Sequence, residues 1–110
     1  MVINFLPKIF VEVQQDFISM LPSGWIEYKL IFVTNEKTHK LKMLYKLSGG
    51  GQWKTCEASG FPLMDKLIAI RKKNGSEFLK DWNSLILQAD ESKVSVEFDV
   101  VGDDEIFGFK

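Results

Sequence analysis

One thiol and one imidazole are the side chains of this sequence that could carry out nucleophilic chemistry. Cys56 is the single cysteine and His39 the single histidine of the 110 residues. A thiol nucleophile needs a base that deprotonates it and a third group that orients the base. Strand pairing could bring the two side chains together, but nothing in the sequence requires it. We expect Cys56 to be a small apolar core residue and His39 to lie at the surface beside a turn, and we predict no catalytic residue.

Two other patterns resemble reactive sites but lack a part that the chemistry needs. Asp103 and Asp104 are adjacent carboxylates on a predicted loop, without an apolar shell that would separate their pKa values for acid–base catalysis. Gly49-Gly-Gly51 precedes a predicted strand, whereas a phosphate-binding loop is followed by a helix. A lone cysteine can form neither an internal disulfide nor a metal cluster. We therefore expect no metal and no cofactor.

Charge is the pattern that indicates binding. The acids of residues 90–105 are Asp90, Glu91, Glu97, Asp99, Asp103, Asp104 and Glu105, and Lys93 is the only base among them. Lys37, Lys40, Lys42 and Lys46 fall in a run of ten residues without an acid. With 14 basic and 15 acidic residues the chain is nearly neutral, so its total charge gives no reason to expect nucleic-acid binding. One acidic edge should therefore oppose one basic strand.

The composition is that of a folded globular domain. A chain with 45% hydrophobic and 26% charged residues is ordinary for this class, and 110 residues predict one domain, residues 1–110. The first residues lack the basic region of a signal peptide, and no stretch is long and apolar enough to span a membrane. A single free thiol suits a reducing compartment. We expect a cytoplasmic protein without a membrane partner.

Hydrophobic periodicity predicts the elements that must position these side chains. Three- and four-residue spacing predicts a helix over 4–21, capped by Asn4 with Pro7 in its first turn. Alternation predicts strands over 25–34, 38–47 and 52–57 in an antiparallel meander, and a final hairpin of 84–89 and 94–100. Helical spacing from Pro62 indicates a helix that ends at Gly75, and Ser76 caps a second short helix that reaches Trp82.

This order predicts an α+β domain of two layers, an antiparallel sheet with two helices on one face, in the sequence α-β-β-β-α-β-β. The strand order is left open. We expect Trp25 and Trp82 to seal the two ends of the core, and Trp53 to be partly exposed. The residues predicted on the other, wet face of the sheet are Glu27, Lys29, Lys40, Lys42, Lys46, Glu97 and Asp99.

Two motifs carry a family resemblance. Met20-Leu-Pro-Ser-Gly-Trp25 follows the first predicted helix, and a hairpin from Trp82 carries alternating hydrophobic residues up to Asp99. These motifs, and the element order over nearly the whole chain, resemble the YezG-like immunity (antitoxin) family of bacterial polymorphic and contact-dependent toxin systems. The chain departs from that family at Ser92, where glycine is usual, and at Val101-Gly-Asp-Asp-Glu105, which replaces a common Tyr-Glu-Asp.

The resemblance implies a small cytoplasmic protein that binds and neutralises a cognate toxin domain, often a nuclease. Because a nuclease holds phosphates in a basic groove, an acidic strand and tail could occupy that groove and speed association. The expected partner is thus a nuclease-type C-terminal toxin domain, rather than nucleic acid. The predicted partner-binding residues are Glu97, Asp99, Asp103, Asp104, Glu105 and Phe107, with Phe109 as a further aromatic candidate.

Other interpretations remain open. The acidic residues could simply form a solvated edge that prevents sheet-to-sheet aggregation. The basic face of the 38–47 strand, with Lys40, Lys42 and Lys46 near Trp53, could belong to a small nucleic-acid-binding module. An enzyme that uses Cys56 and His39 is the third interpretation.

Overall fold

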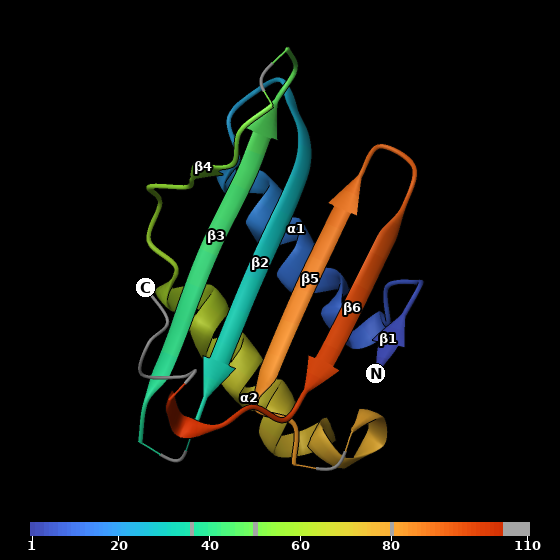
Figure 1. Ribbon diagram of the computed structural model, residues 1–110, viewed down its shortest axis with the longest axis vertical. Helices are drawn as coiled ribbons and strands as arrows, with labels where there is room; N and C mark the ends of the chain where they lie inside the picture. The colour runs from blue at the N-terminus through green and yellow to red at the C-terminus, as the bar shows by residue number, and fades with distance from the viewer. Residues whose placement is uncertain (36, 50, 80, 105–110) are drawn as a thin grey trace.

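A computed structural model describes residues 1–35, 37–49, 51–79 and 81–104. Figure 1 shows the arrangement of its helices and strands. The elements in chain order are β1 (Val2–Ile3), the 3-10 helix η1 (Lys8–Phe10), α1 (Val11–Met20), β2 (Trp25–Thr34), β3 (His39–Leu47), β4 (Lys54–Thr55), α2 (Phe61–Phe78), β5 (Ser84–Asp90) and β6 (Val94–Asp99).

The strands form one antiparallel sheet in the order β1-β6-β5-β2-β3-β4. β2 is the central strand, because it pairs with β3 on one side and with β5 on the other. Leu30 therefore lies opposite both Met43 and Leu87. The β2–β5 pairing joins the predicted meander to the predicted hairpin, and it fixes the strand order that the sequence left open.

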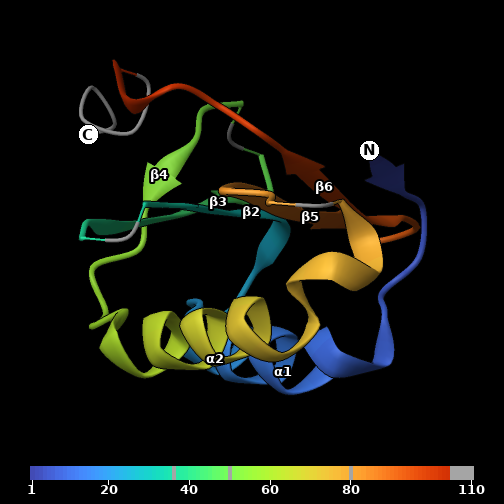
Figure 2. The same ribbon diagram turned by 90° about the horizontal axis from the view of Figure 1, so that it is seen from below.

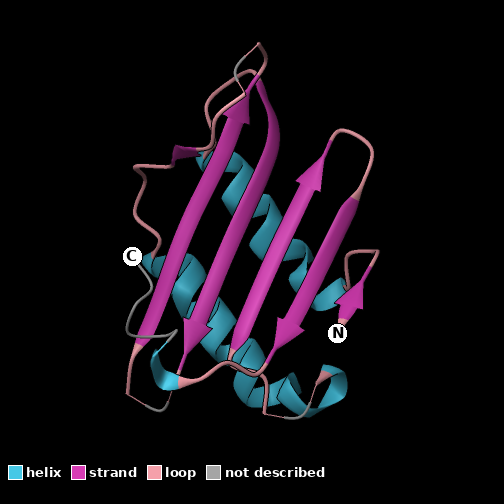
Figure 3. Ribbon diagram, viewed as in Figure 1, coloured by secondary structure: helices cyan, strands magenta, loops and turns pink. Residues whose placement is uncertain are grey.

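Both α-helices cover the same face of the sheet, as Figures 2 and 3 show. The predicted two-layer α+β architecture is therefore confirmed, but the predicted order α-β-β-β-α-β-β is wrong at its start, because the strand β1 precedes the first helix. The core between the layers contains Phe10, Val13 and Phe17 from the N-terminal segment, which pack with β2 residues such as Leu30 and Phe32. Neither α-helix of the described segments has a stretch apolar and long enough to cross a membrane.

The N-terminal helix begins later than the sequence predicts. Pro7 is extended, with φ −59° and ψ 145°, and no side chain caps the helix start, so the expected cap by Asn4 is not formed. Val2 instead lies opposite Glu97 in the sheet, and the Phe98 N–H donates to the Met1 carbonyl over 2.8 Å. The chain must therefore pass from the sheet to the helix layer over residues 4–7, as Figure 2 shows, and a helix that began at residue 4 would not allow this.

Helix α2 is continuous from Phe61 to Phe78, so the predicted break at Gly75 and the separate helix from Ser76 are wrong. The last residue of α2, Phe78, packs against the core. Phe78 stacks on Phe98 at 4.6 Å between ring centroids and lies 6.0 Å from Phe10. This packing exceeds the cost of about 1 kcal/mol for a glycine inside a helix.

The third strand is also shorter than predicted. Only Lys54 and Thr55 pair with β3, opposite Tyr45 and Leu44, whereas the sequence predicted a strand over 52–57. The tryptophans lie as expected. Trp82 is fully buried against Phe98, and Trp25 is half-buried at the other end of β2, edge-on to Tyr28.

Candidate partner-binding face

The face of the sheet opposite the helices, called here the outer face, has its charges sorted by strand. Pairing places Glu97 of β6, Ile86 of β5, Ile31 of β2 and Lys42 of β3 in one row across the sheet. The neighbouring row runs from Asp99 through Ser84 and Val33 to Lys40 in the same way. In these two rows the outer face thus has acids on β6, mainly apolar residues on β5 and β2, and lysines on β3, called here the acidic side and the lysine side; further along β2, Glu27 and Lys29 add both signs of charge to the same face.

The acidic side consists of Glu97 and Asp99, both exposed. Two residues apart on one strand, they point to the same face with Cα atoms about 7 Å apart. The Val100 N–H donates to Asp99 Oδ1 over 2.8 Å, and the Asn83 N–H donates to the Asp99 carbonyl over 3.0 Å. No ion pair engages either carboxylate within the described ranges. Both are therefore placed to meet a cationic partner.

The predicted tail acids lie elsewhere. The Asn83 side chain holds Val101, donating from Nδ2 to the Val101 carbonyl over 2.8 Å and accepting the Val101 N–H at Oδ1 over 2.7 Å. From this clamp, the segment after β6 crosses the outer side of the sheet at the ends of β5 and β2 and runs toward β3 (Figures 1 and 2). Asp103 and Asp104 are exposed on this segment.

The predicted binding residues therefore form two groups instead of one acidic edge. Glu97 and Asp99 remain on β6, whereas Asp103 and Asp104 follow a segment that leaves that strand and is directed toward the lysine side. Glu105, Phe107 and Phe109 lie outside the described residues. The Asn83–Val101 clamp was missed, because its two partners are far apart in the sequence and have no recognisable spacing.

Asp90 is an acid with a structural role. Its Oδ1 accepts hydrogen bonds from the Ser92 N–H over 2.8 Å, the Lys93 N–H over 2.9 Å and Ser92 Oγ over 3.1 Å. These bonds, led by the two backbone donors, lower the pKa of Asp90 below its ordinary value of 3.8. They also explain why serine is accepted at position 92, because its N–H and hydroxyl both bind Asp90.

The lysine side includes an aromatic ring. Lys29 Nζ lies 4.9 Å and Lys46 Nζ 4.6 Å from the centroid of the Trp53 ring, which is half-buried as predicted. Lys46 Nζ also lies 3.8 Å from Glu27 Oε1. The ring therefore holds two ammonium groups by cation–π attraction. Lys46 was expected near Trp53 from the sequence, but the contribution of Lys29 was missed, because Lys29 belongs to another strand.

Cys56 and His39 are not brought together. Cys56 is buried, and its Sγ lies 3.7 Å from the Met20 carbonyl. His39 is exposed, its Nδ1 hydrogen-bonds to Thr34 Oγ1, and its ring stacks on Phe32. Because Cys56 pairs with Met43, four residues along β3 from His39, the two side chains are roughly 13 Å apart along the strand. The expected core role of Cys56 is confirmed.

The described residues contain no cluster of three or more histidine, cysteine, aspartate and glutamate side chains that could hold a metal ion. Comparison with known proteins gives no further assignment. No protein-family model matches the chain, and no curated protein matches it either.

Proposed function

We propose that this protein binds another protein through the outer face of its sheet, and that it is an immunity protein for a bacterial toxin domain of the nuclease type. The observation that carries this proposal is the sorted charge on a sheet face that the helices leave uncovered. A solvated face needs only mixed polar residues. An acidic side beside a lysine side gives the face an orientation that a partner can recognise.

The mechanism rests on competition for a basic groove. A nuclease binds phosphates with lysines and arginines, so its groove attracts carboxylates before contact is made. Glu97 and Asp99 would enter that groove. The half-buried Ile31 and Ile86 beside them would add apolar contact, which is worth about 25 cal/mol per Å² buried. In this proposal the carboxylates raise the rate of association and orient the complex, and the isoleucines add to its affinity.

The toxin as partner comes from the resemblance to the YezG-like immunity family. A cytoplasmic location is part of the same proposal, since an immunity protein must meet its toxin where the toxin acts. The buried, unpaired thiol of Cys56 is compatible with that reducing compartment.

The two acid groups permit a direct test. Binding of the cognate toxin domain would be measured by calorimetry for Glu97→Gln/Asp99→Asn, for Asp103→Asn/Asp104→Asn and for a matched control, Asp65→Asn/Asp81→Asn, which neutralises two exposed acids away from the outer face. We expect the β6 pair to weaken binding about tenfold at low salt and less at high salt, because salt screens exposed charges. The melting temperature should hardly change, since exposed charges add little stability.

The control pair should leave affinity unchanged. A larger loss from Asp103 and Asp104 than from the β6 pair would move the contact to the segment after β6. Equal affinity in every variant would refute the acidic mechanism while leaving the immunity role to be judged by survival.

Nucleic-acid binding at the lysine side is the second candidate. The cluster of Lys29, Lys46 and Trp53 favours it, because an aromatic ring bordered by cations is a common platform for single-stranded bases. Salt-sensitive RNA binding that Lys42→Gln/Lys46→Gln abolishes would support this candidate. Absence of RNA binding by the unmodified protein would remove it.

A further inference from the structure

Along one edge of the sheet, part of the β3 backbone forms no hydrogen bond with any residue that the structure describes, and this part is called here the free edge. β4 pairs only with Leu44 and Tyr45, and the Cys56 N–H donates to the Met43 carbonyl over 2.8 Å. In an antiparallel ladder alternate residues direct their N–H and C=O to the same side, so Leu41 faces this edge as Met43 does. Within the described segments no backbone hydrogen bond reaches Leu41 from that side. Figure 1 shows β4 beside one end of β3 only.

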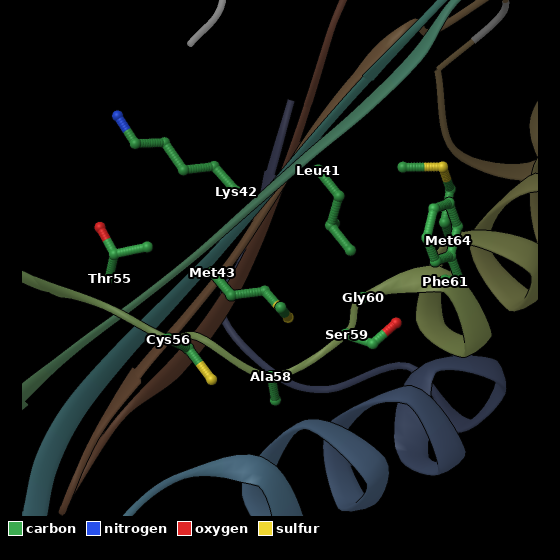
Figure 4. A pocket seen from close by; sticks show the side chains of 10 residues that line it. All are labelled: Leu41, Lys42, Met43, Thr55, Cys56, Ala58, Ser59, Gly60, Phe61 and Met64. Carbon is green, nitrogen blue, oxygen red and sulfur yellow. The ribbon is translucent and has the colours of Figure 1, made fainter.

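A cavity of about 460 Å³ adjoins this free edge. Leu41 and Met43 of β3 line it together with Phe61 and Met64 of α2. Figure 4 shows the Leu41 and Met43 side chains directed toward α2, whereas the Lys42 side chain points to the opposite side of the sheet. Phe61 is 74% exposed, so the opening has a large aromatic ring that no described residue covers. The cavity is therefore an apolar recess within reach of a strand placed along β3.

Gly60 helps to keep this recess open. A Cβ atom at this position would lie 2.7 Å from Leu41 Cδ2 and 3.3 Å from Met43 Cε. A side chain there would force the Leu41 side chain to shift and would crowd Met43. The absence of one lets the loop pass close to β3 while leaving space beside Leu41.

The edge also has a charge pattern. Lys42 points to the outer face, and Leu41 and Met43 on either side of it point to the core side (Figure 4). By strand alternation Lys40 lies on the same face as Lys42. A strand added beside β3 must alternate in step, because opposite residues of paired strands point to the same face. Its side chains opposite the lysines would be acidic, and those facing the cavity would be apolar. Glu57, an exposed acid in the adjoining loop, would repel the carboxylates of such a strand.

We propose that the free edge of β3 receives an extended peptide segment of a partner protein, in which apolar and acidic residues alternate. The segment pairs with the backbone at Leu41, inserts an apolar side chain into the cavity between β3 and α2, and directs its carboxylates toward the lysine side. This is recognition by strand addition, in which backbone bonds give affinity and side-chain pockets give specificity. The surface lies at the opposite edge from Glu97 and Asp99, so the inference does not depend on the acidic mechanism.

A designed peptide tests this surface. The probe is a fluorescein-labelled heptapeptide, Thr-Glu-Leu-Glu-Val-Glu-Thr, with blocked ends, titrated against the full chain and followed by fluorescence polarisation. We expect saturable binding that Lys42→Glu weakens about tenfold and Phe61→Ala about fivefold. Lys72→Glu, an equal charge change at an exposed position of α2, should have no effect. Thermal melts of each variant would show that it is folded.

Two control peptides separate strand addition from charge attraction. A peptide that is N-methylated at its leucine and valine, whose N–H groups would face β3, cannot pair with the edge and should not bind, whereas replacement of each glutamate by lysine should restore binding to Lys42→Glu. Amide chemical shifts should change at Leu41 and Met43. The proposal is overturned by the absence of saturable binding, by equal binding of the N-methylated peptide, or by shift changes confined to β6.

Discussion

Carboxylates of similar exposure have different surroundings in the second hairpin. Asp90 accepts three hydrogen bonds inside its own turn, whereas Glu97 projects from the middle of β6 toward solvent. In the sequence, Asp90 and Glu97 belong to the same acidic stretch, and nothing in it distinguishes their roles. Only the hydrogen bonds separate a residue that shapes the turn from a residue that is available to a partner.

Asp90→Asn tests the structural role. The folded-state pKa of Asp90 lies below 3.8, so its charged form stabilises the fold above that pH, and this stabilisation is lost as the pH falls through the folded value. We expect the variant to melt a few degrees below the unmodified protein at neutral pH, and this gap to close in acid. Melting temperatures across the acid range provide the measurement.

Glu91→Gln is the matched control, since it removes a neighbouring charge without touching those hydrogen bonds. A gap for Asp90→Asn that keeps its size from neutral to strongly acidic pH would contradict the proposed role of the charge.

Phe98 offers a second test at the scale of one residue. It is fully buried, stacks on Phe78 and lies 5.2 Å from the Trp82 ring centroid. Phe98→Ala should lower the free energy of unfolding by about 3–5 kcal/mol, because it removes buried apolar area and leaves a cavity. Phe98→Leu should cost less. Urea unfolding measures both, and a loss below about 1 kcal/mol for the alanine variant would conflict with the described packing.

Among the elements, those with clear local periodicity were the predictable ones. β6 alternates apolar and polar residues, β2 and β5 are rich in β-branched, aromatic and other apolar residues, and each of the three strands falls within a residue or two of its expected range. The continuity of α2 was not predictable, because Gly75 and Ser76 look like an end and a start unless the packing of Phe78 on Phe98 is known. A local signal was overridden by a contact that is distant in sequence.

The clamp between Asn83 and Val101 can be tested as a device that directs the chain after β6. Asn83→Ala removes both side-chain hydrogen bonds and should cost about 1–3 kcal/mol of unfolding free energy. It should also speed hydrogen exchange at the Val101 amide. Asn83→Asp keeps the acceptor for that amide and loses the donor, so its effect should be smaller.

Unchanged exchange at Val101 in the alanine variant would mean that the clamp does not hold this segment. Toxin binding by the same variant would then show whether the position of Asp103 and Asp104 affects recognition.

At the scale of the whole molecule, the sequence predicted opposite charges but could not predict their arrangement. The acids of β6 and the lysines of β3 are separated by β5 and β2, and this order depends on the long-range β2–β5 pairing. The cavity beside β3 was also hidden, because it exists only where β4 ends after two residues and Gly60 brings the loop close. Alternation of apolar and polar residues predicts on which face of the sheet a side chain lies, but it does not predict which strands lie next to each other.

The proposed immunity role makes one demand on the whole molecule: the protein would have to neutralise a toxin inside a cell. The first measurement is co-expression with the C-terminal domain of whichever large secreted protein is encoded beside it, scored by cell survival and co-purification. We predict survival and a stoichiometric complex that Glu97→Gln/Asp99→Asn weakens. Cell death without a complex would contradict immunity against that toxin and would direct attention to the lysine side.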